Sequence, residues 1–165
     1  MQTILLFIAT LFSYAQSSAV WKPTGCDFFT KANAVKILGT DVTWTGIDAT
    51  ANEPKKWTCT YLPKDKAEWP NIYFGLHRYQ TVESAKEEFD TIVDSNKDHS
   101  GFRKWEGVGD DAIIQADGGN FQLVMVRKGV RTLRIKVNPA GSTSFEDVKS
   151  VAEDLVRKME GMDAK

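Results

Sequence analysis

Histidine and cysteine are scarce in this sequence, which has only two of each among its 165 residues. Two cysteines with no histidine near them do not complete the four ligands of a structural zinc site, so we predict no metal site. No serine lies in a Gly-x-Ser-x-Gly motif, and no glycine-rich loop ends in the Gly-Lys-Ser/Thr of a P-loop. The sequence therefore predicts no catalytic residue and no cofactor.

A strong excess of charge of either sign is also missing. The chain has 21 lysines and arginines against 22 aspartates and glutamates, which gives a formal net charge of −1. That balance argues against a nucleic-acid-binding protein and against a protein that coats a membrane surface as a whole. We therefore expect no nucleic-acid partner.

The N-terminal segment lacks charged side chains up to Lys22 and contains one apolar run, Ile4–Phe12. This run is too short to cross a membrane as a helix, but it has the length of the apolar region of a signal peptide. Small residues at the spacing that signal peptidase reads allow cleavage after Ala15 or Ala19. We expect residues 1–19 to be a signal peptide and the mature protein to be secreted or periplasmic, with no transmembrane segment.

The two cysteines, Cys26 and Cys59, most simply form one disulfide in an exported protein. The bridge would close a loop of about 34 residues and stabilise the fold by roughly 3–4 kcal/mol in the chain-entropy model. Acylation of Cys26 as a lipoprotein is the alternative. Pro23 stands where a lipoprotein signal has an aliphatic residue, and Cys26 lies far beyond the apolar run, so lipid anchoring is not expected.

Residues 20–165 are predicted to form a single α+β domain with the element order α-β-β-β-α-β-β-β-α. Short turns between successive strands favour an antiparallel β-sheet of about six strands with three packed helices. The absence of alternating βαβ units argues against a nucleotide-binding Rossmann fold. From periodicity and capping residues, helices are expected at 27–38, 81–95 and 145–159, and strands at 42–47, 57–62, 72–79, 112–115, 121–127 and 130–137.

The stretch 107–111, Gly-Val-Gly-Asp-Asp, suggests two kinds of binding site. Its paired carboxylates could hold a hard cation, and its glycine backbone could bind a phosphate. The spacing matches neither a P-loop nor an EF-hand. We interpret the stretch as a tight turn in which the glycines adopt unusual φ angles and the aspartates cap the turn.

The two histidines, His77 on a strand and His99 in a loop, are the groups that an enzyme would have to use. A small hydrolase or metal-dependent enzyme would combine one of them with Asp110 or Asp111. Proximity of His99 to Asp98 along the chain does not make a catalytic triad in space. We expect each histidine to face solvent.

A basic stripe of five residues within eleven contains no acidic residue: Arg127, Lys128, Arg131, Arg134 and Lys136. Alternation on the last strand places Leu133, Ile135 and Val137 on one face and Thr132, Arg134 and Lys136 on the other. This cationic face could bind an anionic small molecule, an acidic or sulfated glycan, or an acidic protein surface. Alternatively it is an ordinary solvated sheet face, neutralised by acids on a neighbouring strand.

Two of the five tryptophans, Trp69 and Trp105, lie in polar connections and are predicted to be the most exposed. Exposed aromatic side chains can stack on sugars or anchor a protein partner. The candidate binding set is therefore Arg131, Arg134, Lys136 and Trp105.

Several short motifs follow one another along the chain, each occurring once. They are Cys-Asp-Phe-Phe at 26–29, Ile-Leu-Gly at 37–39, Cys-Thr-Tyr at 59–61, Gly-Val-Gly-Asp-Asp-Ala at 107–112, Arg-Lys-Gly at 127–129 and a closing amphipathic helix. The pattern resembles small secreted bacterial α/β domains of unknown function. Such domains occur as lipoproteins and as extracellular sensor domains of mycobacterial receptor kinases. The resemblance implies a compact sheet-and-helix domain with a Cys26–Cys59 bridge, and it brings no catalytic residue.

These observations favour a secreted, non-enzymatic binding or sensor-like domain of unknown ligand, for which the basic stripe suggests an anion. A small extracytoplasmic hydrolase or metal-dependent enzyme is the first alternative. A structural component of the cell envelope is the second.

Overall fold

The computed structural model describes residues 25–50, 55–65, 70–141 and 143–163. The predicted signal peptide, residues 1–19, and the predicted exposed Trp69 lie outside these ranges. No helix in the described part of the chain is both long enough and apolar enough to span a membrane.

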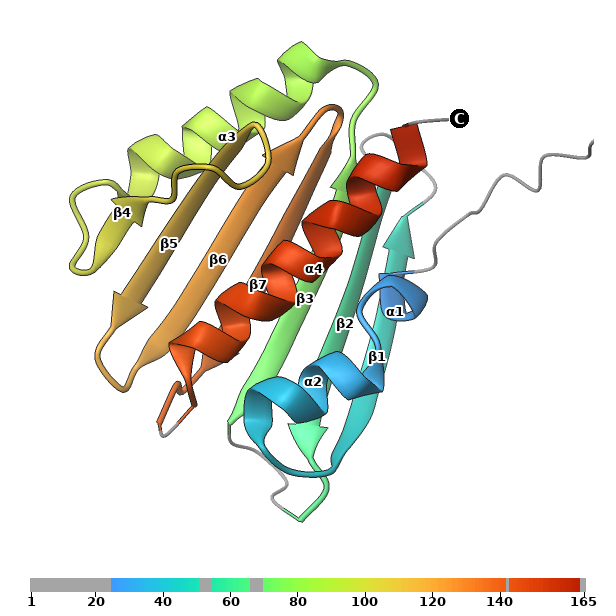
Figure 1. Cartoon of the computed structure of the whole chain (residues 1–165), viewed down its shortest axis with the longest axis vertical. Helices are drawn as coiled ribbons and strands as arrows, with labels where there is room; N and C mark the ends of the chain where they lie inside the picture. Colours follow the sequence, from blue (N-terminus) through green and yellow to red (C-terminus); the bar gives the residue numbers. More distant parts are fainter. Residues whose placement is uncertain (1–24, 51–54, 66–69, 142, 164–165) are drawn as a thin grey trace, which may run out of the picture.

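The described residues contain one antiparallel sheet in the order β1-β2-β3-β7-β6-β5-β4 (Figure 1). The α+β class and the predicted succession of helices and strands are confirmed, with seven strands in place of about six. The strands are β1 (Val42–Thr50), β2 (Lys55–Pro63), β3 (Asn71–Arg78), β4 (Phe102–Lys104), β5 (Asp111–Asp117), β6 (Phe121–Lys128) and β7 (Arg131–Asn138).

The additional strand, β4, lies in a segment that the sequence predicts to be a polar connection. It has only three residues and forms the sheet edge beside β5, where Phe102 pairs with Gln115. The polar loop predicted at 48–56 is also shorter than expected, because β1 continues to Thr50 and β2 begins at Lys55.

The first predicted helix, 27–38, is two helices, α1 (Gly25–Phe28) and α2 (Lys31–Leu38). Thr30 has an extended backbone that separates them, and its hydroxyl accepts the Asn33 amide N–H at 3.3 Å. Gly39 ends α2 with a left-handed φ of 67°, which glycine adopts without steric cost. Thr30 and Gly39 therefore cap the two ends of α2.

The remaining helices are α3 (Val82–Asn96) and α4 (Phe145–Asp163). Thr81 caps α3 through a reciprocal pair of hydrogen bonds with Ser84, as the sequence predicts for the start of this helix. The apolar spacing of the sequence 82–93 predicts burial of Val82 as well, but Val82, in the first turn of α3, is 44% exposed, and the helix buries Ala85 and Phe89.

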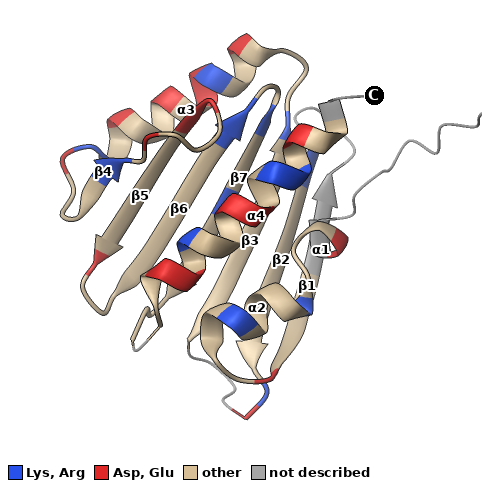
Figure 2. Cartoon of the chain, in the orientation of Figure 1, with Lys and Arg blue, Asp and Glu red and all other residues tan. Residues whose placement is uncertain are grey.

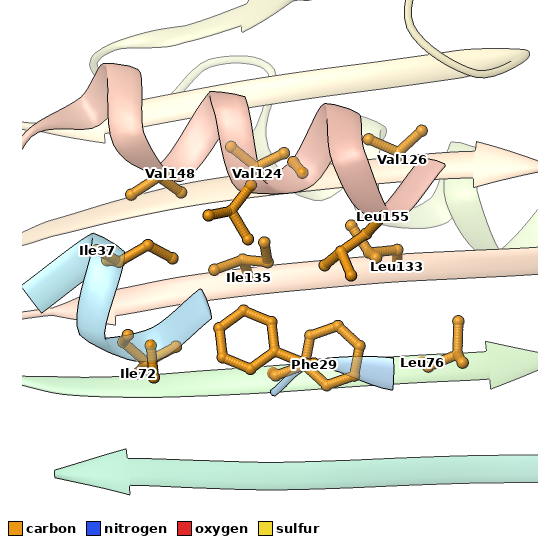
Figure 3. Packing of buried hydrophobic residues seen from close by; sticks show 14 of the residues in the cluster. Phe29, Ile37, Ile72, Leu76, Val124, Val126, Leu133, Ile135, Val148 and Leu155 are labelled. Atoms are coloured by element: carbon orange, nitrogen blue, oxygen red, sulfur yellow. The ribbon is translucent and has the colours of Figure 1, made fainter. Parts of the chain in front are cut away.

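One face of the sheet, here called the front face, is covered by α1, α2 and α4 (Figure 1). Figure 3 shows Val148 and Leu155 of α4 lying over Val124 and Ile135 of the two central strands. These side chains belong to a single apolar cluster that also includes Phe29, and all five are fully buried. At roughly 1.5–3 kcal/mol for each fully buried apolar side chain, this layer is the main source of stability.

The opposite face, here called the back face, is covered only in part by described residues. Helix α3 packs on β6 and β7 there, and Phe89 joins Ile113 and Met125 in a second, smaller apolar cluster. Strands β2 and β3 carry polar and aromatic side chains on this face, including Tyr73, which is 37% exposed. The back-face part of β2, β3 and β7 beside α3 is called the open face below.

Candidate functional site

The basic stripe of the sequence is divided into two groups by the fold. Arg127 points to the back face near α3, and its side chain binds both Asp110, at 3.2 Å, and Asp111, at 2.6 Å. Lys128 binds Asp110 at 3.1 Å and Glu160 of α4 at 3.3 Å. Figure 2 shows this meeting of basic and acidic residues where the end of β6 lies beside the loop before β5. These two cations are neutralised within the fold.

The stretch 107–111 is a structural turn, as interpreted from the sequence. Gly107 and Gly109 have φ angles of 79° and 64°, and the Asp110 amide donates to the Arg127 carbonyl at 2.8 Å. The Asp110 carboxylate accepts a hydrogen bond from the Gly129 N–H at 2.7 Å. It therefore caps the β6–β7 turn, which lies outside the stretch 107–111. Burial raises the pKa of Asp110, but the bonds from Gly129, Lys128 and Arg127 outweigh it and hold the pKa below 3.8.

The carboxylates of this turn are therefore not placed to receive a cation. A depression of about 210 Å³ lies between α3 and residues 104–113, and both Asp110 and Asp111 line it. Their oxygens already bind Arg127, and neither histidine lines the depression. Within the described ranges, no three His, Cys, Asp or Glu side chains gather as a metal site requires.

The geometry also separates the histidines from the aspartates. His77, Thr132, Arg127 and Asp111 occupy one row across four successive strands of the sheet. Three strand spacings place His77 and Asp111 about 14 Å apart, and Arg127 lies between them. His99 is exposed in the loop before β4. The hydrolase alternative requires a histidine beside Asp110 or Asp111, and His77 does not meet this requirement.

Two members of the predicted binding set lie away from the other two. Trp105 is half-buried against the front-face core, and Lys149 of α4 lies 5.6 Å from its ring centroid. The prediction that Trp105 is among the most exposed tryptophans is therefore wrong, because α4 partly covers it. In the strand pairing, Arg131 is the partner of Lys128 on β6 and of Arg78 on β3. By alternation along β7, its side chain faces the front side of the sheet.

Arg134 and Lys136 remain together on the open face. Neither takes part in an ion pair among the described residues, whereas Arg127 and Lys128 each bind two carboxylates. The ammonium group of Lys136 lies 4.9 Å from the ring centroid of Phe121, which is a cation–π contact.

Strand β3 brings further donors beside these two cations. Three rows cross β2, β3 and β7: Lys56–His77–Thr132, Thr58–Gly75–Arg134 and Thr60–Tyr73–Lys136. Sequence alternation correctly places Tyr73, Gly75 and His77 on one side of their strand. It does not reveal that this strand pairs with β7, so it gives no reason to include Tyr73 and His77 in the site.

His77 is half-buried and does not face solvent freely, contrary to the prediction. Burial, together with the nearby positive charges of Lys56 and Arg134, lowers the pKa of His77 to about 4. Its imidazole is therefore neutral at pH 7. Because the ring lies among cations, an anion is the ligand that this surface attracts most strongly.

Cys59, which is 1% exposed on the front face of β2, is not a free thiol. Helix α1, which contains Cys26, packs on β2. The side chain of Cys26 itself lies outside the described part of the structure.

No protein-family model and no curated protein matches this chain. The resemblance to small secreted bacterial domains therefore stays an expectation from the sequence motifs.

Proposed function

We propose that this protein is a secreted or periplasmic, non-enzymatic binding or sensor-like domain that binds an anionic ligand on its open face. The observation that carries the proposal is the pair Arg134 and Lys136, which lie on a partly uncovered sheet face and form no ion pair with a described carboxylate. Unpaired cations that lie side by side attract anions at distances greater than those of direct contact.

An extracytoplasmic location agrees with the N-terminal sequence and with the cysteines. The apolar run before Lys22 has signal-peptide length. The chain has only two cysteines, and the thiol of Cys59 is not free, which supports a Cys26–Cys59 bridge between α1 and β2. Such bridges persist in oxidising compartments. Non-reducing mass mapping of the exported protein tests both points.

The binding proposal is tested with dextran sulfate, a flexible polyanion, and with uncharged dextran of the same length. We expect saturable binding of dextran sulfate that weakens as the salt concentration rises, and no binding of dextran. The double variant Arg134→Glu/Lys136→Glu should bind at least about tenfold more weakly, which corresponds to about 1.4 kcal/mol.

A matched control changes the net charge equally at another place. Arg103→Glu/Lys158→Glu alters two exposed cations that lie on β4 and α4. This control should retain the wild-type affinity. Equal loss of affinity in both double variants would mean that only net charge matters, and absence of saturable binding would favour a structural envelope component.

A further inference from the structure

The side chains of Tyr73 and His77 converge over Gly75 from opposite directions along β3. A Cβ atom at Gly75 would lie 3.9 Å from Tyr73 Oη and 3.7 Å from His77 Nε2. Two polar atoms from residues four positions apart thus approach one point of the sheet. They can do so because Gly75 has no side chain to separate the two rings.

A hydrogen-bond chain determines which nitrogen of His77 faces that point. The Nδ1 atom of His77 lies 3.4 Å from Tyr79 Oη, and Tyr79 in turn has a side-chain hydrogen bond with Thr132. Thr132 and Tyr79 are both buried. If the Thr132 hydroxyl donates to Tyr79 and the Tyr79 hydroxyl donates to Nδ1, the ring proton of the neutral imidazole is on Nε2. The Nε2–H group then points toward the space beside Gly75.

The guanidinium group of Arg134 supplies the charge. Arg134 is the direct partner of Gly75 on β7, and its charge is felt by both His77 and Tyr79. Lys56 and Lys136 lie in the neighbouring rows. The acidic group whose charge reaches this cluster from α3 is Glu88, which acts on Tyr79.

We propose that Tyr73 Oη–H, His77 Nε2–H and the Arg134 guanidinium form a subsite for one oxyanion group of the ligand, a sulfate or phosphate ester. The inference rests on the proposed function, because it places part of the anionic ligand on the open face. All three groups act as donors, and a sulfate or phosphate group presents three oxygens that only need to accept. A neutral hydroxyl would bring no negative charge to the guanidinium, and among these three groups it could donate only to the Tyr73 oxygen.

The subsite is tested with inorganic sulfate, inorganic phosphate and acetate as small probes. Nitrogen-15 NMR of the histidine side chains should show Nε2 of His77 as the protonated nitrogen in the free protein. Sulfate or phosphate should then shift the His77 resonances, whereas acetate, with two oxygens in one plane, should bind at least about threefold more weakly. Phosphate changes its protonation between pH 5 and pH 8, whereas sulfate does not. The affinity for phosphate relative to that for sulfate, measured across this pH range, therefore shows which of the two groups the subsite prefers.

Variants identify the donors. Tyr73→Phe removes one hydroxyl and keeps the ring, and we expect sulfate affinity to fall roughly five- to tenfold. His77→Leu should produce a similar loss, and Arg134→Met a larger one. Thr43→Val and Lys158→Met remove a hydroxyl and a charge from exposed positions elsewhere and should leave the affinity unchanged. Unfolding midpoints of all variants show whether each one is folded at the temperature of the assay.

The two proposals fail in different ways. If Tyr73→Phe and His77→Leu bind sulfate and dextran sulfate as the wild type does, while Arg134→Glu/Lys136→Glu does not, the open face binds anions without this subsite and the inference is overturned. If the wild-type protein binds neither dextran sulfate nor the small probes, the proposed function and the subsite are both overturned. Acetate affinity equal to that of sulfate would overturn the assignment to a sulfate or phosphate ester.

Discussion

Arg127 donates from Nε to Oδ2 of Asp111 at 2.7 Å, and the two residues are direct partners in the pairing of β5 with β6. The arginine is only 7% exposed, so its charge depends on this carboxylate and on Asp110 for compensation. This relationship fixes the loop before β5 against the β6–β7 turn. It also engages carboxylate oxygens of Asp110 and Asp111 that would otherwise be open to a cation.

Substitution of Arg127 should therefore destabilise the fold without affecting the open face. We expect Arg127→Met to lower the free energy of unfolding by about 1.5–3 kcal/mol, since two partly buried carboxylates lose a charged hydrogen-bond partner. Urea denaturation measures the loss. Arg103→Met, at an exposed position on β4, should change the free energy by less than about 0.5 kcal/mol. A stability equal to that of the wild type for Arg127→Met would contradict this account.

The two glycines of the same turn should respond differently to alanine. A Cβ at Gly109 would lie 2.5 Å from Val126 Cγ1 and 2.6 Å from the Arg127 carbonyl oxygen, whereas a Cβ at Gly107 meets no atom within 4 Å. Both positions have left-handed φ angles. Gly107→Ala should cost about 1–2 kcal/mol for the backbone alone, and Gly109→Ala about 2–5 kcal/mol because steric overlap is added. Thermal and urea unfolding of the pair would show whether the order is reversed.

The pKa of His77 predicts a pH dependence of stability. Its folded pKa of about 4 lies below the ordinary value of 6.5, so between these two values the unfolded chain binds the proton and the folded protein does not. Stability should rise as the pH increases from about 4 to 6.5. The contribution is about 1–2 kcal/mol, because solvent screening reduces it at this partly exposed site.

Two variants separate this effect from other titrating groups. His77→Gln should have a flatter stability profile between pH 4 and 6.5 than the wild type. Arg134→Met should raise the pKa of His77, since it removes a positive charge close to the ring. An NMR titration of the His77 ring in both proteins measures the shift, and an unchanged pKa in Arg134→Met would show that Arg134 does not act on His77.

The front-face core should depend strongly on α4. Leu155 is fully buried in this core, so Leu155→Ala should lower the free energy of unfolding by about 2–5 kcal/mol. Val82→Ala shortens an apolar side chain that is largely exposed on α3 and should change stability by less than about 0.5 kcal/mol. Chemical denaturation compares the two, and a similar loss in both would mean that the core is not where the structure places it.

Much of the fold could be predicted because local signals agree with it. Thr30, Gly39 and Thr81 have the chemistry of helix caps, and Gly129 turns between β6 and β7 with a φ of 54°. The strand β4 could not be predicted in the same way, because three residues are too few to show alternation. The apolar spacing continues across Thr30, so it predicts one helix where the structure has α1 and α2.

The candidate site was predicted less well because its residues come from strands far apart in the sequence. Alternation correctly separates Arg134 and Lys136 from Leu133 and its neighbours. It does not show that Asp110 and Asp111 neutralise the first part of the basic stripe. Nor does it show that Tyr73 and His77 lie beside Arg134, because that depends on the pairing of β3 with β7.

The pairing of β3 with β7 also has a consequence during biosynthesis. β7 is the last strand to leave the ribosome, yet it lies at the centre of the sheet. Until it emerges, β3 presents an open edge and the front-face core lacks both β7 and α4. A nascent chain with this topology cannot complete its sheet until late in translation, and until then the unpaired edge of β3 and the apolar side chains of the front face stay open to non-native pairing.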